Sequence, residues 1–159
     1  MISLWSSDTE EENLFVSIVC QANYCRSPVA EAILKSRFQD NIRFDSSGLS
    51  PYPDSSMDPR SRDFLIKKGY EVAIHNPKLF TNHLAKASSI VLAADTNILF
   101  QLNSQFKNMS HKFRVLSFKH RDIPTSDPFS LDKEKYYEVM CNIEKICNDF
   151  KTDDFILKN

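Results

Sequence analysis

Two residues that can perform phosphate chemistry, Cys20 and Arg26, stand six positions apart near the start of the chain. The apolar run 14–19 comes directly before Cys20, and Ser27-Pro28 follows Arg26. Pro28 suits the first turn of a helix, where a missing N–H group costs no hydrogen bond. A helix N-terminus presents unpaired N–H groups and the positive end of the helix dipole, so the loop that leads into it can hold an anion. This pattern predicts a loop that binds a phosphate-sized dianion and also carries a nucleophile, Cys20.

The five residues between Cys20 and Arg26 give the loop enough length to curl around an anion. Such a loop can turn its amide groups inward and bring the guanidinium fork of Arg26 to the same oxygens that the sulfur faces. The resulting field favours the thiolate, which is the nucleophilic form of cysteine. The alternative interpretation is that Cys20 is a small buried hydrophobic residue. The residues expected to form the phosphate-binding loop around them are Gln21, Ala22, Asn23, Tyr24, Cys25 and Ser27.

Strand-like and helix-like apolar patterns alternate along the chain. We expect strands at 14–19, 42–46, 89–93 and 113–118, and helices at 28–38, 59–68, 97–102 and 136–150. Gly69 is expected to end the second helix as its C′ residue. The alternation predicts an α/β fold: a four-stranded parallel sheet flanked by helices on both faces, with the phosphate-binding loop between the first strand and the first helix. Cys20 then lies at the carboxyl end of a strand, where such folds bind ligands.

The composition is that of one domain with a genuine core: 159 residues, 42% of them hydrophobic, and a formal net charge of -1. Residues 1–13 are acidic and are interpreted as a polar N-terminal tail, and residues 14–159 as a single domain. The intermixed charges provide no footprint for nucleic acid or an anionic membrane. No apolar run approaches the length needed to span a bilayer. The sequence leaves the oligomeric state open.

The four cysteines and four histidines form no recognisable disulfide or metal pattern. Four cysteines in a chain of this size do not make a disulfide framework, and a working thiolate needs a reducing compartment, so we expect the cytoplasm. The histidines lack metal-ligand spacing. They are interpreted as surface or capping residues: His75, His83, His111 and His120.

The segment Val19 to Pro28 reads Val-Cys-Gln-Ala-Asn-Tyr-Cys-Arg-Ser-Pro. It resembles the nucleophilic loop of the low-molecular-weight protein tyrosine phosphatases, Val-Cys-x-Gly-Asn-x-Cys-Arg-Ser-Pro. That family also has a distant Asp-Pro followed by an aromatic residue, matched here by Asp127-Pro128-Phe129. Two motifs at this separation are more specific than either alone. Further likeness brings the match to roughly residues 14 to 150, at Ala30-Glu31-Ala32, Asp45-Ser46-Ser47-Gly48, Asp58-Pro59-Arg60, Gly69 and Ala94-Asp95-Thr96-Asn97.

The resemblance implies hydrolysis of aryl phosphates, above all phosphotyrosine in protein substrates, with inorganic phosphate as the product. Cys20 would attack phosphorus and form a cysteinyl-phosphate, while Arg26 would bind two equatorial oxygens in a bidentate contact. Ser27 would hydrogen-bond the sulfur, and Asn23 would hold the loop in shape, since Asn tolerates a left-handed backbone. Asp127 would protonate the leaving oxygen and then activate water. No metal or organic cofactor is needed.

Two assignments keep an alternative. Asp127 could be only a turn residue, and Asp122 is the second candidate for the acid; the Pro-aromatic continuation favours Asp127. Tyr52 and Phe129 are expected at the substrate rim. Tyr52 and Tyr24 either stack on an aryl ring there or are exposed loop aromatics.

Three positions depart from the family pattern. Ala22 replaces a glycine, which would perturb the loop if that backbone needs a positive φ. Gln21 replaces an apolar residue that in the family packs against the substrate ring, and Phe129-Ser130 replaces a pair of aromatic residues. These departures bear on substrate preference more than on the chemistry.

Two other functions stay open beside the phosphatase. Relatives on this fold reduce arsenate with further cysteines, and the candidates here are Cys141 and Cys147. Six residues apart on a helix, they are about 9 Å apart in rise, too far for a disulfide, and are interpreted as core packing. The other alternative is a non-catalytic phosphate-binding module. Finally, a curled loop brings Cys25 near Cys20, where it either captures an oxidised Cys20 as a disulfide or merely packs behind the loop.

Overall fold

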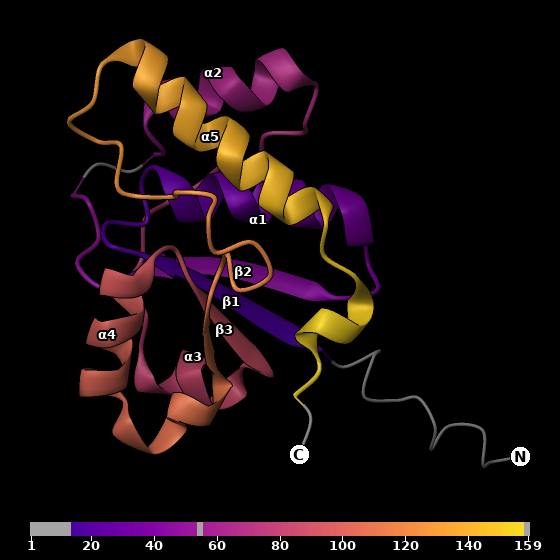
Figure 1. The fold of residues 1–159 in the computed structure, drawn as a ribbon, viewed down its shortest axis with the longest axis vertical. Coiled ribbons are helices and arrows are strands. Elements are labelled where there is room, and N and C mark those ends of the chain that lie inside the picture. Colours follow the sequence, from indigo (N-terminus) through magenta and orange to yellow (C-terminus); the bar gives the residue numbers. More distant parts are fainter. Residues whose placement is uncertain (1–13, 54–55, 158–159) are drawn as a thin grey trace, which may run out of the picture.

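The computed structural model describes residues 14–53 and 56–157, in which strands and helices alternate (Figure 1). In chain order the elements are β1 (Phe15–Cys20), α1 (Arg26–Phe38), β2 (Arg43–Gly48), α2 (Pro59–Lys68), α3 (Asn82–Ala87), β3 (Ile90–Ala93), α4 (Thr96–Gln105), the 3-10 helix η2 (Lys107–Lys112), β4 (Phe113–Val115), α5 (Lys133–Asn148) and the 3-10 helix η3 (Thr152–Phe155). The predicted polar tail, residues 1–13, lies outside the described residues. Within those residues, no helix has both the length and the apolar character to cross a membrane.

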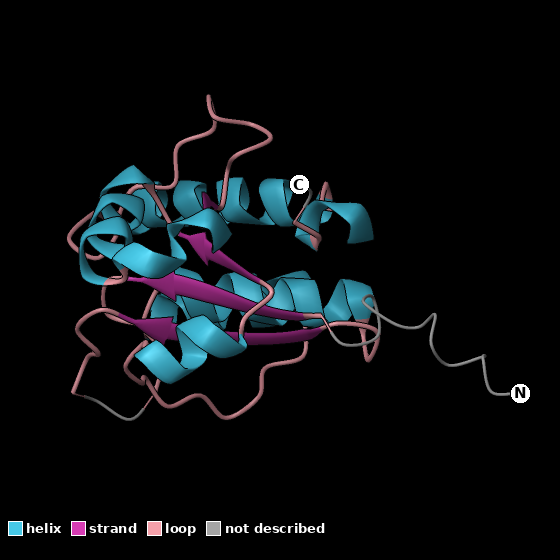
Figure 2. Cartoon of the chain, turned by 90° about the horizontal axis from the view of Figure 1, so that it is seen from below, coloured by secondary structure: helices cyan, strands magenta, loops and turns pink. Residues whose placement is uncertain are grey.

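The four strands form one sheet in the order β2-β1-β3-β4, and every neighbouring pair is parallel. Cys20 pairs with Gly48, and Val19 pairs with Ala93, so the carboxyl ends of β1, β2 and β3 lie together. Figure 2 shows the sheet between two layers of helices. The predicted fold class, a four-stranded parallel sheet with helices on both faces, is therefore confirmed.

Each face of the sheet has its own apolar core, because successive side chains of a strand point to opposite faces. Val16 and Ile18 are fully buried on the face covered by α1, α2 and α5, which lie together on one side of the sheet in Figure 1. Val19 and Val91 are fully buried on the other face, which α3 and α4 cover. Both cores hold β1 in place, and with it the start of the loop that follows.

The ends of two helices follow signals that are visible in the sequence. Helix α2 begins after Asp58, whose carboxylate accepts a hydrogen bond from the N–H of Arg60, and Pro59 takes the first helical position. It ends at Gly69, which has the left-handed φ of 87° expected of a C′ glycine. Helix α5 begins in the same way after Asp132, whose side chain accepts from the N–H of Lys135.

Other boundaries differ from the predictions. Strand β4 stops at Val115 instead of 118, because the chain turns there and the N–H of Phe118 donates to the carbonyl of Val115. Helix α5 ends at Asn148, before Phe150. Helix α3 was not predicted, because its six residues are too few to show an apolar period; Thr81 caps it.

Candidate active site

The loop between β1 and α1 is held by hydrogen bonds on its outer side. The carbonyl oxygens of residues 20 to 25 accept, in order, from Leu49 N, Ser50 N, Tyr52 N, His75 Nε2, Asp58 N and Ser61 Oγ, at 2.7 to 3.1 Å. The described chain has no cis peptide bond, so the N–H that shares a peptide plane with each of these carbonyls points the opposite way. The N–H groups of residues 21–26 therefore face the interior of the loop, as in an anion-binding nest.

Asn23 gives the loop its sharpest turn. Its φ is 52°, the left-handed conformation that asparagine tolerates. Its side-chain amide donates to Ser27 Oγ at 2.8 Å and to Ser46 Oγ at 3.0 Å, and its oxygen accepts from the N–H of Lys78 at 3.0 Å. Ala22 is not among the residues with a positive φ, so its backbone does not require the glycine of the family.

The sulfur of Cys20 lies at the base of the loop, and only 2% of the residue is exposed. Its Sγ is 3.0 Å from the Oγ of Ser27, which is itself fully buried. Because the amide of Asn23 donates to the same oxygen, the hydroxyl hydrogen of Ser27 is left to donate elsewhere, and the sulfur is its nearest acceptor. Ser27 is thus placed to donate a hydrogen bond to Cys20.

Gly48 is a site residue that sequence reasoning missed, because its partner is distant in the sequence. A Cβ atom on Gly48 would lie 2.7 Å from the backbone N of Asn23 and 2.9 Å from the carbonyl O of Gln21. Both are backbone atoms of the loop, so a side chain here would displace the loop itself. The close approach of β2 to the loop therefore requires a glycine.

The guanidinium of Arg26 is buried and held along one edge. Its Nη1 donates to Oδ2 of Asp95 at 2.6 Å and to the carbonyl of Thr125 at 2.9 Å. Among the residues that the structure describes, its Nε has no hydrogen-bond partner although it is buried. A buried donor without a partner is costly, and this one lies beside an anion-binding loop. The free edge of the guanidinium is therefore available to an anion.

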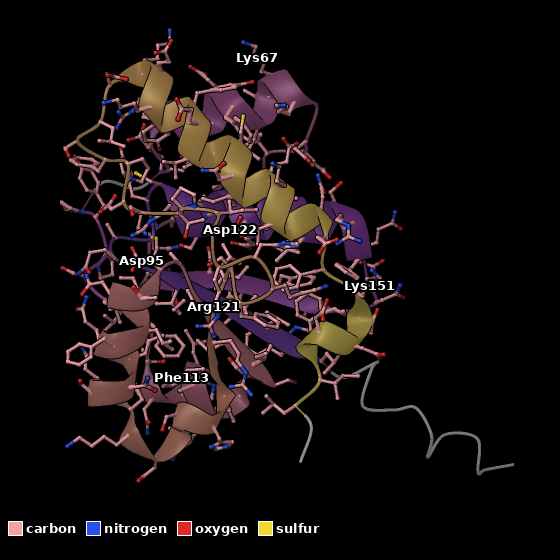
Figure 3. All side chains as sticks on the ribbon, in the orientation of Figure 1. Lys67, Asp95, Phe113, Arg121, Asp122 and Lys151 are labelled. Carbon is pink, nitrogen blue, oxygen red and sulfur yellow. The ribbon has the colours of Figure 1, made fainter. Side chains whose placement is uncertain are left out.

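Asp95 is a second site residue that sequence reasoning missed. It caps α4 by accepting a hydrogen bond from the N–H of Ile98 at 2.9 Å, and Figure 3 labels it at that end of the helix. Burial alone lowers the pKa of Arg26, but the negative charges of Cys20 and Asp95 raise it above its ordinary value. Asp95 thus fixes the direction of the guanidinium and supports its charge. The only signal in the sequence was the family likeness at 94–97.

The three predicted catalytic residues, Cys20, Arg26 and Asp127, line one pocket of about 160 Å³. The other residues that line it are Gln21, Ala22, Cys25, Tyr52 and Phe129. Asp122, labelled in Figure 3, is exposed and does not line this pocket. Three predicted loop residues are not among those that line the pocket: Asn23, Tyr24 and Ser27. Ser27 contacts the sulfur of Cys20, Asn23 donates to Ser27, and Tyr24 stacks on Tyr52.

Three aromatic rings stand together at the pocket. Tyr24 and Tyr52 are stacked with ring centroids 4.0 Å apart, and Phe129 lies 6.0 Å from Tyr52 and 6.2 Å from Tyr24. Tyr24 is 7% exposed, so it supports Tyr52 from below instead of standing free in solvent. Gln21 also lines the pocket, and its side chain accepts a hydrogen bond from the side chain of Gln101 at 3.2 Å. The pocket thus has both aromatic and polar lining residues.

The other three cysteines are Cys25, Cys141 and Cys147. Burial raises the pKa of Cys25 to about 12, and its thiol donates to Asp58 at 3.7 Å. Cys147 is fully buried on α5 and burial raises its pKa as well, while Cys141 is partly buried; neither forms a disulfide. Across the described ranges, no group of three or more His, Cys, Asp or Glu side chains could hold a metal ion.

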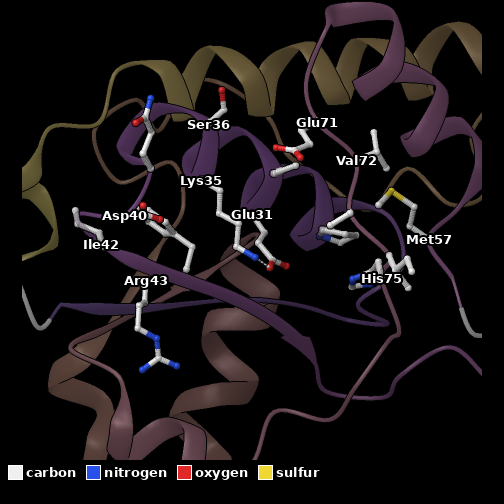
Figure 4. A pocket seen from close by; sticks show the side chains of 16 residues that line it. Glu31, Lys35, Ser36, Asp40, Ile42, Arg43, Met57, Glu71, Val72 and His75 are labelled. Atoms are coloured by element: carbon white, nitrogen blue, oxygen red, sulfur yellow. Dashed lines mark ion pairs between the residues drawn. The ribbon is translucent and has the colours of Figure 1, made fainter.

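A larger pocket of about 780 Å³ lies beside α1 and β2, on a different part of the molecule (Figure 4). Glu31 and Lys35, which form an ion pair at 2.7 Å, and Arg43 belong to its lining, but none of the predicted catalytic residues does. His75 also lines it and bonds to the carbonyl of Asn23 at 2.7 Å. Sequence reasoning treated His75 as a surface or capping residue, yet it supports the phosphate loop.

The fold and the site together define a cysteine-dependent phosphatase. Residues 15–155 match the family described as "Low molecular weight phosphotyrosine protein phosphatase". This match covers most of the chain, and the chain belongs to that family.

Curated relatives agree with this membership, and a solved structure shares the fold. A putative low molecular weight protein-tyrosine-phosphatase of Klebsiella pneumoniae is 27% identical over 132 residues, covering 82% of this chain and 90% of the relative. The low molecular weight phosphotyrosine protein phosphatase of Sus scrofa is 28% identical over 152 residues, covering 89% and 96%. The structure of tyrosine phosphatase Wzb from Escherichia coli K30, in complex with sulphate, aligns with a TM-score of 0.78 at 22% identity, covering 84% of this chain and 93% of that one.

Proposed function

We propose that this protein hydrolyses phosphotyrosine in protein substrates, and aryl phosphates generally, through a cysteinyl-phosphate. The observation that carries the proposal is a single small pocket with three reacting groups: the sulfur of Cys20, the free buried edge of Arg26 and the carboxyl group of Asp127. The inward N–H groups of residues 21–26 complete the binding site for the phosphoryl oxygens. The residues that line this pocket, with those that hold them in place, supply the groups that the reaction needs.

In the first step, the sulfur of Cys20 attacks phosphorus in line with the ester bond. The S–P bond forms while the P–O bond to the aryl group breaks, and the carboxyl group of Asp127 gives its proton to the leaving oxygen. Arg26 and the inward N–H groups stabilise the charge on the equatorial oxygens. The aryl alcohol leaves, and the phosphoryl group stays on the sulfur.

In the second step, water releases the phosphoryl group as inorganic phosphate. The carboxylate of Asp127 takes a proton from a water molecule, whose oxygen attacks phosphorus as the S–P bond breaks. The sulfur departs as a thiolate, and the hydroxyl group of Ser27, 3.0 Å from Sγ, donates a hydrogen bond to it. Asp127 is then protonated again and ready for another cycle.

The aromatic residues that line the pocket favour a substrate with an aryl leaving group. Tyr52 and Phe129 line the pocket, and Tyr24 holds Tyr52 in its place by stacking. A planar ring entering above the phosphate site meets these rings and gains aromatic contact that an aliphatic phosphoserine lacks. The proposed partner is therefore a protein or peptide that presents phosphotyrosine.

The test is a comparison of kcat/KM for peptides of one sequence that carry phosphotyrosine, phosphoserine or phosphoarginine. The phosphoarginine peptide is included because a solved relative in fold, the YwlE arginine phosphatase of Geobacillus stearothermophilus, has a TM-score of 0.77 at 23% identity. We expect the phosphotyrosine peptide to react best. A preference for phosphoarginine would contradict the substrate assignment. Phosphate binding without hydrolysis of any peptide would point to the non-catalytic module.

The arrangement of the cysteines favours the phosphatase over an arsenate reductase. A reductase of this kind needs further cysteines that can reach the nucleophile. Cys141 and Cys147 belong to α5, and neither lines the pocket of Cys20. Their burial supports the interpretation that they pack the core.

Cys25 is the proposed redox partner of Cys20, because both line the same pocket. Its raised pKa of about 12 keeps it a thiol near neutral pH, so it loses its proton only as it attacks the oxidised Cys20. Peroxide converts the sulfur of Cys20 to a sulfenic acid; the sulfur of Cys25 then attacks it, an S–S bond forms and water leaves. A thiolate nucleophile that depends on such protection belongs in a reducing compartment, for which we propose the cytoplasm.

We expect Cys25→Ser to lose the ability to recover from peroxide. Without Cys25, the sulfenic acid proceeds to the sulfinic acid, which dithiothreitol does not reduce. The measurement is phosphatase activity after peroxide and then dithiothreitol, in the wild type and in Cys25→Ser. Cys141→Ser, a change outside the pocket, is the matched control. If Cys25→Ser regains as much activity as the wild type, Cys25 has no protective role.

A further inference from the structure

Asp127 lies in residues 127–131, here called the acid loop, which belongs to no helix or strand. Two bonds within the loop give it a turn: the N–H of Phe129 donates to Oδ1 of Asp127 at 3.1 Å, and the N–H of Leu131 donates to the carbonyl of Pro128 at 2.9 Å. Asp127 and Phe129 are both exposed. Local bonds of this kind shape the loop but do not fix its distance from Cys20. The position of the acid loop must therefore come from a contact with another part of the protein.

Phe129 packs against Tyr24 and Tyr52, and the side chain of Arg60, in the first turn of α2, holds the backbone of the loop. Its Nη1 donates to the carbonyl of Leu131 at 3.1 Å, and its Nη2 donates to the carbonyl of Phe129 at 3.0 Å. Both carbonyls belong to the acid loop, on the C-terminal side of Asp127. The guanidinium also lies over the ring of Tyr136 from α5, 3.9 Å from the ring centroid. The guanidinium of Arg60 thus binds two backbone carbonyl oxygens of the acid loop and packs against the ring of Tyr136.

The other edge of Arg60 is tied to the phosphate loop through Asp58. The Nε and Nη2 of Arg60 donate to the two carboxylate oxygens of Asp58 at 3.0 and 2.8 Å, a bidentate pair. The N–H of Asp58 donates to the carbonyl of Tyr24 at 2.9 Å, and the thiol of Cys25 donates to its carboxylate. Asp58 is 3% exposed, so this anchor lies within the protein. Arg60 therefore spans from the back of the phosphate loop to the acid loop.

We propose that Arg60 is a positioning residue for the general acid, holding Asp127 at the distance from Cys20 that proton transfer requires. The inference deepens the proposed function and depends on it. Arg60 does not line the pocket, so it acts on the substrate through the segments that it contacts, of which the acid loop carries Asp127. A misplacement of about 1 Å in a reacting group costs on the order of 10²-fold in rate. Loss of the hydrogen bonds from Arg60 to the acid loop is therefore expected to impair protonation of the leaving group much more than phosphate binding.

The test compares Arg60→Gln and Arg60→Lys with the wild type on a series of aryl phosphates. We expect kcat/KM, which reports the steps up to release of the phenol, to fall by a factor on the order of 10 to 10² for phenols of high pKa, which need protonation. For phenols of low pKa, which leave without help, kcat/KM should change little. Lysine has a single ammonium group and cannot hold the carboxylate of Asp58 and two carbonyls together, so Arg60→Lys should restore only part of the rate.

Two controls separate this role from a general loss of structure. Arg62→Gln removes the same charge from an exposed position of α2 and should leave the whole series unchanged. Inorganic phosphate should inhibit Arg60→Gln with an unchanged inhibition constant, because none of the hydrogen bonds that hold the carbonyls of residues 20–25 comes from Arg60. Combining Arg60→Gln with Asp127→Ala should cost no more than Asp127→Ala alone, since both remove the same acid.

The outcomes decide the proposal separately from the function. An equal fall of kcat/KM for all leaving groups, or a weakened inhibition by phosphate, would overturn the positioning role and make Arg60 a structural residue. Additive losses in the double variant would overturn it as well. If the wild type itself hydrolyses no aryl phosphate, the proposed function fails, whatever Arg60 does.

Discussion

Cys20→Ser is expected to lower the hydrolysis of aryl phosphates by a factor on the order of 10⁴ or more. A serine hydroxyl at this position is a far weaker nucleophile than a thiolate. The anion-binding parts remain, because the inward N–H groups of residues 21–26 and the guanidinium of Arg26 do not depend on the sulfur. The variant should therefore still bind inorganic phosphate, as measured by calorimetry.

The matched control for Cys20→Ser is Cys141→Ser, which makes the same exchange on α5, outside the pocket. It should keep the wild-type kcat with p-nitrophenyl phosphate. A Cys20→Ser protein that turns over at a rate near that of the wild type would remove the covalent step from the mechanism. Loss of phosphate binding together with activity would show that the sulfur also maintains the shape of the loop.

Asp127→Ala is expected to lower kcat by a factor on the order of 10² to 10⁴, which is the range for the loss of a general acid. Among the described residues that line the pocket, Asp127 has the one acidic side chain. The loss of kcat/KM, which reports the step that releases the phenol, should be greatest for substrates whose phenol has a high pKa and smallest for nitrophenols. The measurement is kcat and kcat/KM across a series of substituted phenyl phosphates.

Asp122→Ala is the control for this prediction, because Asp122 is also exposed and precedes Asp127 by five positions without lining the pocket. It should leave the dependence on the leaving group unchanged. If instead Asp122→Ala shows the steep dependence and Asp127→Ala does not, the acid has been assigned to the wrong residue.

The elements that carry strong local signals could be predicted from the sequence. The apolar runs before Cys20 and around Val91 are short, continuous and β-branched, which is typical of central parallel strands. Gly69 has no side chain to oppose a left-handed φ, so its place after a helical period predicts the end of α2. The loop motif likewise is local, since Cys20 and Arg26 are only six residues apart and share one turn of chain.

The support of the site could not be predicted in the same way, because it comes from contacts between distant segments. Gly48 approaches the loop only after β2 pairs with β1. Asp95 reaches Arg26 across 69 positions, and Arg60 reaches the carbonyl of Leu131 across 71. No spacing rule links such residues, and each also has an ordinary local role: Asp95 caps α4 and Arg60 pairs with Asp58. Their second role appears only when the topology brings the segments together.

The most direct test of the covalent mechanism is to stop the reaction of an aryl phosphate with acid within the first turnover and to locate the phosphoryl group. Asp127→Ala is suited to this, because the loss of the residue that activates water should let the intermediate accumulate. Trypsin releases residues 1–26 as one peptide, since Arg26 is the first basic residue of the chain. We predict that this peptide carries one phosphoryl group on Cys20 and that Cys20→Ser abolishes the burst of phenol that accompanies it. A protein that carries no phosphoryl group while phenol is released, or carries it on another residue, would contradict the mechanism.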